Sequence, residues 1–190
     1  TRTNAKIEAM VNYFSSAEPA DAAWAIYFLS GEKLRRLVPT KLLRQWAAEE
    51  ANIPPWLFEE SYSSVGDLAE TISLIVPEQK NETTGSLTEW VEERLQPIRS
   101  MDEEQQREVV TTIWHQNPAK VRFVILKLIT GAFRVGVSKR LVTRALAEHT
   151  GISAEVIAHR LMGNWIPTPE SFLRLSNPDI DDAVASQPYP

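Results

Sequence analysis

Apolar residues recur at the spacing of an α-helix along almost the whole chain, and this periodicity constrains the fold more than any other feature. The clearest case lies between residues 4 and 15, where positions i, i+3, i+4 and i+7 of one helix face hold Ile7, Met10, Val11 and Phe14. The alternation of apolar and polar residues that marks a half-buried strand is nearly absent. The sequence therefore predicts an all-α fold of about ten or eleven helices.

Two of the predicted helices flank a short glycine-containing loop. The first covers residues 118–130, with Asn117 as a candidate N-cap and Gly131 at its C-terminal end, where glycine readily adopts a positive φ. The second begins at Ser138, a favourable N-cap residue, and ends at Gly151. We expect these helices to form a helix–loop–helix hairpin with the loop at its tip.

Two further helix starts are indicated by capping boxes, in which a polar cap residue is followed three positions later by an acidic residue. The stretches Ser-Leu-Thr-Glu at 86–89 and Ser-Met-Asp-Glu at 100–103 both fit this pattern. Each is therefore predicted to begin a helix.

The length of 190 residues is sufficient for one substantial core, in a single domain or in two lobes that share it. Residues 1–176 are predicted to form the helical domain, and residues 177–190, which are rich in proline and aspartate, a linker toward another domain. Both ends look like cuts in a longer protein. No apolar run approaches the roughly 20 residues of a membrane helix and no signal peptide is visible, so we expect a cytoplasmic protein and no membrane partner.

Motifs for enzyme chemistry are missing from the sequence. There is no cysteine, which excludes disulfides, zinc–thiolate sites and cysteine nucleophiles. The three histidines lack metal-binding spacing, and neither a phosphate-cradling GxxxxGK[ST] loop nor a GxSxG elbow occurs. Adjacent glutamates such as Glu49 and Glu50 point in different directions on a helix, so they do not form a shared acid–base pair.

The distribution of charge is uneven, although the net charge is only −5. No acidic residue occurs between Glu108 and Glu148. The same interval holds seven cations, namely Lys120, Arg122, Lys127, Arg134, Lys139, Arg140 and Arg144. Such a local excess favours a polyanionic partner, because binding responds to the local field more than to the total charge. The alternative is a solvated face whose acids lie elsewhere in the fold.

The loop between the two flanking helices combines features suited to a nucleic-acid backbone. Gly131 and Gly136 permit tight turns or close approach, and Arg134 between them is expected to project outward. Phe133 and Val135 are expected to anchor the loop in the core. The helix start after the loop offers free N–H groups to an anion, and an arginine in a narrow minor groove gains from its negative potential. Alternatively, the glycines only make a turn and Arg134 is solvated.

A family resemblance rests on the stretch KLITGAFRVGVSKRLVTRAL at 127–146, which resembles the signature of the N-terminal DNA-binding domain of ATP-dependent DNA ligases. In that family a helix ends in Thr-Gly, and a loop of the form Phe- or Leu-Arg-Ile/Val-Gly and a basic helix follow. The stretches at 3–14, 60–71 and 159–172 are similar to the bacterial branch of these ligases, in the same order. The resemblance covers nearly the whole chain and implies an all-helical domain that grips duplex DNA around a nick.

Carried over position by position, the resemblance implies a DNA-contacting set of Thr3, Asn4, Lys6, Gly66, Gly131, Ala132, Phe133, Arg134, Val135, Gly136, Ser138, Lys139, Arg140 and Arg144. Eukaryotic members usually have a basic residue where this chain has Ala132. The loop lacks an Asn- or Gln-rich face for reading bases, so we expect binding that is independent of sequence.

The resemblance also implies what the chain does not do alone. The nucleotidyl-accepting lysine of the family lies in a Lys-x-Asp-Gly motif, and none of the seven lysines here is followed by x-Asp-Gly. We therefore expect no catalytic residue and no cofactor in this chain, with ATP and Mg²⁺ used by the parent ligase. The implied partners are nicked or intact double-stranded DNA and the adenylation and OB-fold domains of the same enzyme, in a monomer located at the bacterial nucleoid. A helical protein-interaction module and a helix-turn-helix regulator are the alternatives.

Overall fold

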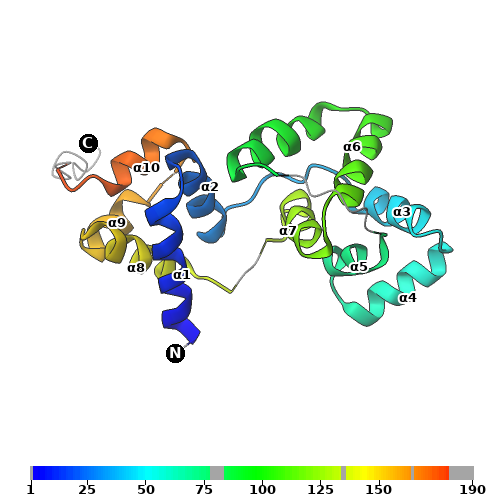
Figure 1. The fold of residues 1–190 in the computed structure, drawn as a ribbon, viewed down its shortest axis with the longest axis horizontal. Helices are drawn as coiled ribbons and strands as arrows, with labels where there is room; N and C mark the ends of the chain where they lie inside the picture. The colour runs from blue at the N-terminus through cyan, green and yellow to red at the C-terminus, as the bar shows by residue number, and fades with distance from the viewer. Residues whose placement is uncertain (1, 78–83, 134–135, 164, 180–190) are drawn as a thin grey trace, which may run out of the picture. The chain divides into compact units, whose positions relative to one another are not determined.

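The computed structural model describes residues 2–77, 84–133, 136–163 and 165–179, and all regular structure within them is helical (Figure 1). Ten α-helices are present in these ranges, and a π-helical segment continued by a 3-10 segment lies between α5 and α6. The predicted all-α fold is thereby confirmed. The chain divides into two compact units, which we call the terminal unit (Thr1–Glu32 and Arg134–Pro190) and the central unit (Lys33–Phe133).

The terminal unit is built from the two ends of the chain. It contains α1 (Arg2–Ser16), α2 (Pro19–Leu29), α8 (Lys139–Thr150), α9 (Ala154–Arg160) and α10 (Pro169–Ser176). Helix α1 packs against α8, α2 against α10, and α8 against α9. The predicted apolar face of α1 supplies Ile7, Met10 and Phe14 to the core, where α8 contributes Val142, Ala145 and Leu146.

The central unit contains α3 (Thr40–Glu50), α4 (Pro55–Val65), α5 (Leu68–Ile75), η1 (Glu89–Leu95), η2 (Gln96–Ser100), α6 (Glu103–Gln116) and α7 (Ala119–Thr130). Helix α5 packs mainly against α7, and α3 contacts α4, α5 and α6. The two helices beside the glycine-containing loop, α7 and α8, thus belong to different units. The predicted order of helix, loop and helix is present, and each helix packs within its own unit.

Side-chain caps account for the starts of α5, α6, α8, α9 and α10. Ser138 and Ser153 cap α8 and α9 as predicted, and the box at 86–89 is formed, because Glu89 Oε2 accepts from Ser86 N at 3.0 Å and Ser86 Oγ accepts from Glu89 N at 3.2 Å. The box at 100–103 was wrongly placed. Residues up to Ser100 continue as a 3-10 segment, and α6 is capped instead by Asp102.

The predicted N-cap role of Asn117 is also wrong. Its side chain serves the preceding helix, since Asn117 Nδ2 donates to Ile113 O at 2.8 Å, and Pro118 takes the position before α7.

Candidate nucleic-acid interface

Gly131 ends α7 in the left-handed conformation that the sequence predicts. Its φ is +66°, its N–H donates to Leu128 O at 3.2 Å, and the next N–H, of Ala132, donates to Lys127 O at 3.0 Å. These two bonds form a Schellman motif. A Cβ atom added at Gly131 would lie 3.1 Å from Leu34 O, so the close approach allowed by this glycine is toward the protein's own backbone.

Gly136 and Lys6 come together although 130 positions separate them. Lys6 Nζ donates to Gly136 O at 2.6 Å, and both residues belong to the terminal unit. Gly136 has a φ of +64°, which favours glycine, and a Cβ atom placed there would lie 3.1 Å from Lys6 Nζ. The packing of α1 against α8 produces this contact and places an ammonium group beside an exposed loop backbone.

The start of α8 carries cations only a few residues after Gly136. Ser138 Oγ accepts from Leu141 N at 3.3 Å and caps the helix, whose first turn contains no acidic residue. Lys139, Arg140 and Arg144 are exposed, and Lys139 Nζ donates to Leu161 O, at the end of α9, at 3.0 Å. Cations at a helix N-terminus oppose the helix dipole, typically by 0.3–1 kcal/mol, so this arrangement gains from a bound anion.

Thr3 and Asn4 lie exposed in the first turn of α1. Thr3 is three positions before Lys6, which places the two on neighbouring parts of one helix face. The structure therefore brings Lys6, Gly136 and the start of α8 into one unit with the beginning of α1. We call Lys6, Gly136, Ser138, Lys139 and Arg140 the basic helix start.

Other predicted site residues are placed differently. Ala132 is exposed and Phe133 is only partly buried, so Phe133 is not the core anchor that the sequence predicted. Arg134 and Val135 lie outside the described residues, and their predicted roles stay predictions. Gly66 ends α4 with a φ of +78° and belongs to the central unit, where the turn into α5 accounts for it.

Two of the seven cations in the acid-free interval are structural, which corrects the charge interpretation. Arg122 is fully buried in the central unit, and its guanidinium donates to the carbonyl oxygens of Ser73 (3.3 Å), Val76, Pro77 (3.5 Å) and Asn117 (3.1 Å). It thereby satisfies carbonyls at the C-terminal end of α5 that have no partner within the helix.

Lys127, the second structural cation, forms an ion pair with Asp67, the N-cap residue of α5. Burial opposes ionisation of Asp67, but hydrogen bonds from Lys127 and from Glu70 N, together with the Lys127 charge, outweigh it and lower the pKa of this carboxyl group. The positive field of the interval is therefore smaller than the sequence alone suggests.

Sequence reasoning missed a basic segment in the central unit. Lys33, Arg35 and Arg36 are all exposed, while Leu34 and Leu37 between and after them are buried. Three cations within four residues could have indicated a basic surface. The stretch from Gly31 to Pro39 has no helical periodicity, however, so the sequence did not indicate which of its residues are exposed.

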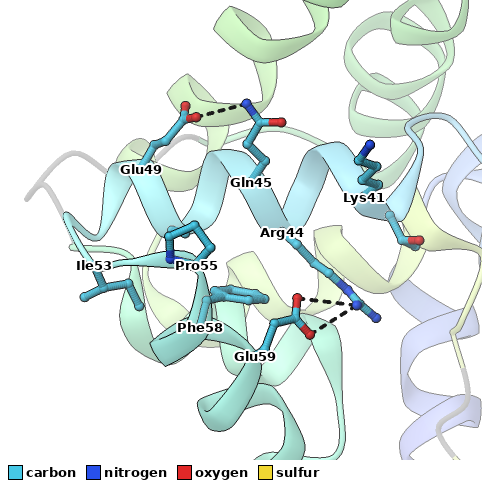
Figure 2. A pocket seen from close by; sticks show the side chains of 10 residues that line it. Lys41, Arg44, Gln45, Glu49, Ile53, Pro55, Phe58 and Glu59 are labelled. Carbon is cyan, nitrogen blue, oxygen red and sulfur yellow. Dashed lines mark hydrogen bonds and ion pairs between the residues drawn. The ribbon is translucent and has the colours of Figure 1, made fainter.

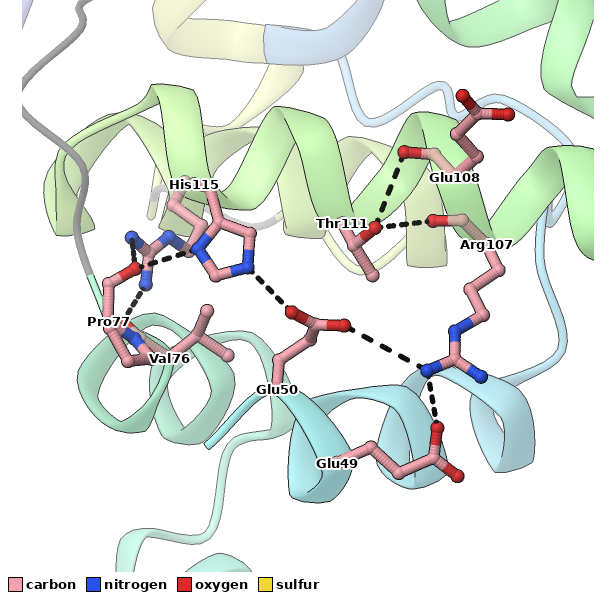
Figure 3. A network of polar contacts seen from close by, with 9 residues as sticks. Glu49, Glu50, Val76, Pro77, Arg107, Glu108, Thr111 and His115 are labelled. Atoms are coloured by element: carbon pink, nitrogen blue, oxygen red, sulfur yellow. Dashed lines mark hydrogen bonds and ion pairs between the residues drawn. The ribbon is translucent and has the colours of Figure 1, made fainter. Parts of the chain in front are cut away.

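A polar network joins α3 and α6 (Figure 3). Arg107 Nη2 pairs with Glu49 Oε2 at 2.7 Å, and His115 Nε2 meets Glu50 Oε2 at 2.7 Å. Both glutamates approach Arg107, since Glu50 Oε1 lies 3.9 Å from its Nη2, and together they link the two helices rather than standing on a solvated face. Across the described part of the chain, no group of three or more histidine, aspartate and glutamate side chains could hold a metal ion.

A surface groove of ≈ 610 Å³ lies along α3 and α4 (Figure 2). Its most prominent cation, Arg44, pairs with Glu59 at 3.3 Å and stacks 4.6 Å from the centre of the Tyr62 ring. Because the lining carries both signs of charge and the arginine already has an acidic partner, the groove has no evident preference for an anion.

The described residues define an all-helical module with exposed cations at the start of α8. A protein-family model described as "DNA ligase N terminus" matches residues 1–147, more than three quarters of the chain. The chain therefore belongs to the family of N-terminal domains of ATP-dependent DNA ligases. A search of curated proteins finds no match. Among the described residues, no helix is long and apolar enough to cross a membrane.

Proposed function

We propose that this module binds duplex DNA around a nick, without sequence preference, through phosphates and the minor groove. The observation that carries the proposal is the basic helix start, where Lys6 Nζ meets Gly136 O at 2.6 Å beside a capped helix that has cations and no acid in its first turn. Free N–H groups and adjacent cations are a favourable combination for a phosphate.

The electrostatics of α8 support an anionic partner. Arg140 and Arg144 are four positions apart on one helix face and both exposed, and like charges at this spacing cost an isolated helix about 0.2–0.5 kcal/mol. A polyanion removes this cost and the unfavourable interaction with the helix dipole. A phosphate backbone presents such charges at short, regular intervals.

Within a ligase, the proposed role is positioning. No lysine of the chain is followed by x-Asp-Gly, so we assign no adenylation step to it. ATP and Mg²⁺ would be used by the adenylation and OB-fold domains of a parent enzyme that seals nicks in replication, repair and recombination. A monomeric member of the bacterial branch, acting on DNA in the cytoplasm, fits the sequence resemblance.

The proposal is tested by titrating the purified chain into labelled nicked, intact and single-stranded oligonucleotides of several random sequences. We expect binding to both duplexes with little dependence on sequence. The slope of log K against log salt should be negative, by about 0.9 for each phosphate contacted. Affinity that does not change with salt, or strong preference for one sequence, would instead support the protein-interaction or the helix-turn-helix alternative.

A further inference from the structure

The basic segment Lys33–Arg36 is held in a fixed position on the central unit. Leu37 N donates to Ile129 O in α7 at 3.2 Å, and the side chains of Leu34 and Leu37 are only 8% and 6% exposed. These contacts fix the backbone on both sides of the two arginines. The segment is therefore already ordered in the folded protein, so binding of a ligand costs less conformational entropy.

The segment lies directly beside the end of α7. The Cβ position of Gly131 is 3.1 Å from Leu34 O and 3.7 Å from Lys33 Cδ. Gly131 is the first residue of the loop that the family resemblance assigns to DNA. Lys33 and the beginning of this loop consequently share one surface of the central unit.

The arginines of the segment differ from three cations of the same unit that already have acidic partners. Arg44 pairs with Glu59, Arg107 with Glu49, and Lys127 with Asp67. For the side chains of Arg35 and Arg36, the described residues provide neither a hydrogen bond nor an ion pair, and both residues are exposed. A pair of adjacent arginines without acidic partners, on a fixed backbone, is suited to an external anion.

We propose that Lys33, Arg35 and Arg36 form a second contact row for the phosphate backbone of DNA, separate from the basic helix start. An extended chain advances at most about 3.6 Å per residue, so these cations extend over at most roughly 10 Å. One strand of B-DNA carries a charge about every 3.4 Å along the helix axis, and the row can therefore engage more than one phosphate. This inference rests on the proposed function, because it takes duplex DNA as the partner.

The test compares Arg35→Gln/Arg36→Gln with the matched control Lys41→Gln/Lys120→Gln, which removes two exposed cations elsewhere on the central unit. Binding of the 190-residue chain to a random duplex is measured from about 50 to 200 mM salt. Loss of two phosphate contacts should make the slope of log K against log salt shallower by about 1.8. The ratio of the binding constant of the unmodified chain to that of the variant should then fall about tenfold between about 50 and 200 mM salt.

The control should show a slope of log K against log salt close to that of the unmodified chain. The charge-preserving Arg35→Lys/Arg36→Lys variant should show most of the steepness of that slope. If the unmodified chain binds duplex DNA while Arg35→Gln/Arg36→Gln retains its affinity and slope, the contact row is refuted and the proposed function stands. If the Lys41→Gln/Lys120→Gln control loses as much affinity and slope as Arg35→Gln/Arg36→Gln, the contact row is refuted as well. If the unmodified chain does not bind duplex DNA, the proposed function itself fails.

Discussion

Replacing Gly136 with alanine separates the backbone strain of its turn from a role in DNA binding. A left-handed conformation costs a residue with a Cβ atom roughly 1–2 kcal/mol, and φ at Gly136 is +64°. The added Cβ would lie 3.1 Å from Lys6 Nζ, the mobile end of a long side chain, so Lys6 moves and its bond to Gly136 O weakens. We expect the free energy of unfolding to fall by about 1–2 kcal/mol.

Gly151→Ala provides the matched control at the other end of α8. Gly151 has a φ of +74°, so the backbone strain is equivalent, but nothing lies within 4 Å of its Cβ position. Both variants should lose similar stability in urea denaturation. Only Gly136→Ala should weaken binding to duplex DNA in fluorescence anisotropy, by about tenfold or ~1.4 kcal/mol. Equal affinity for the two folded variants would refute the assignment of Gly136 to the interface.

Three further predictions concern individual side chains. Arg122→Met should lower the free energy of unfolding by about 2–4 kcal/mol, because buried carbonyls lose their donor, whereas the exposed control Arg99→Met should change it by less than about 0.5 kcal/mol in the same urea titration. Asp67 has a lowered pKa in the folded state, so its stabilising effect is complete above its unfolded pKa near 3.8 and is lost as the pH falls through the folded value. Denaturation at a series of pH values should show a smaller loss of stability below pH 3.8 for Asp67→Asn than for the unmodified chain. Arg134→Ala should weaken DNA binding in anisotropy titrations while the stability changes by less than about 0.5 kcal/mol, and a large loss of stability with normal binding would make Arg134 structural.

Helix boundaries were the most predictable features, because they depend on residues within one turn of each other. Ser138, Ser153 and Gly131 act as the sequence indicates. The failure at Ser100 has a local cause as well, since Asp102 offers the same cap chemistry two positions later and its backbone is extended where a cap requires it.

The functions of the cations were less predictable, because spacing alone does not say which charges face inward. Arg122 was counted as part of a positive surface, yet Ile125, Leu126 and Ile129 follow it at i+3, i+4 and i+7 and place it on the buried face of α7. That signal was present in the sequence. Lys6 and Gly136 were assigned to one site only through the family resemblance. Their contact results from the packing of α1 on α8, two helices that lie far apart in the sequence, so no local pattern predicts it.

The division of the terminal unit between the two ends of the chain has a consequence for synthesis on the ribosome. Helices α1 and α2 emerge first, but α8 and α10, which cover them, follow more than 100 residues later. At a synthesis rate of about 5–20 residues per second, the apolar residues of α1 and α2 remain uncovered for several seconds or longer before α8 and α10 are made. The central unit, which is continuous from Lys33 to Phe133, is complete before then and can fold first. The nascent chain thus passes through a stage in which a folded central unit is joined to two helices whose apolar residues are uncovered, and a chaperone acting at this stage would bind α1 and α2.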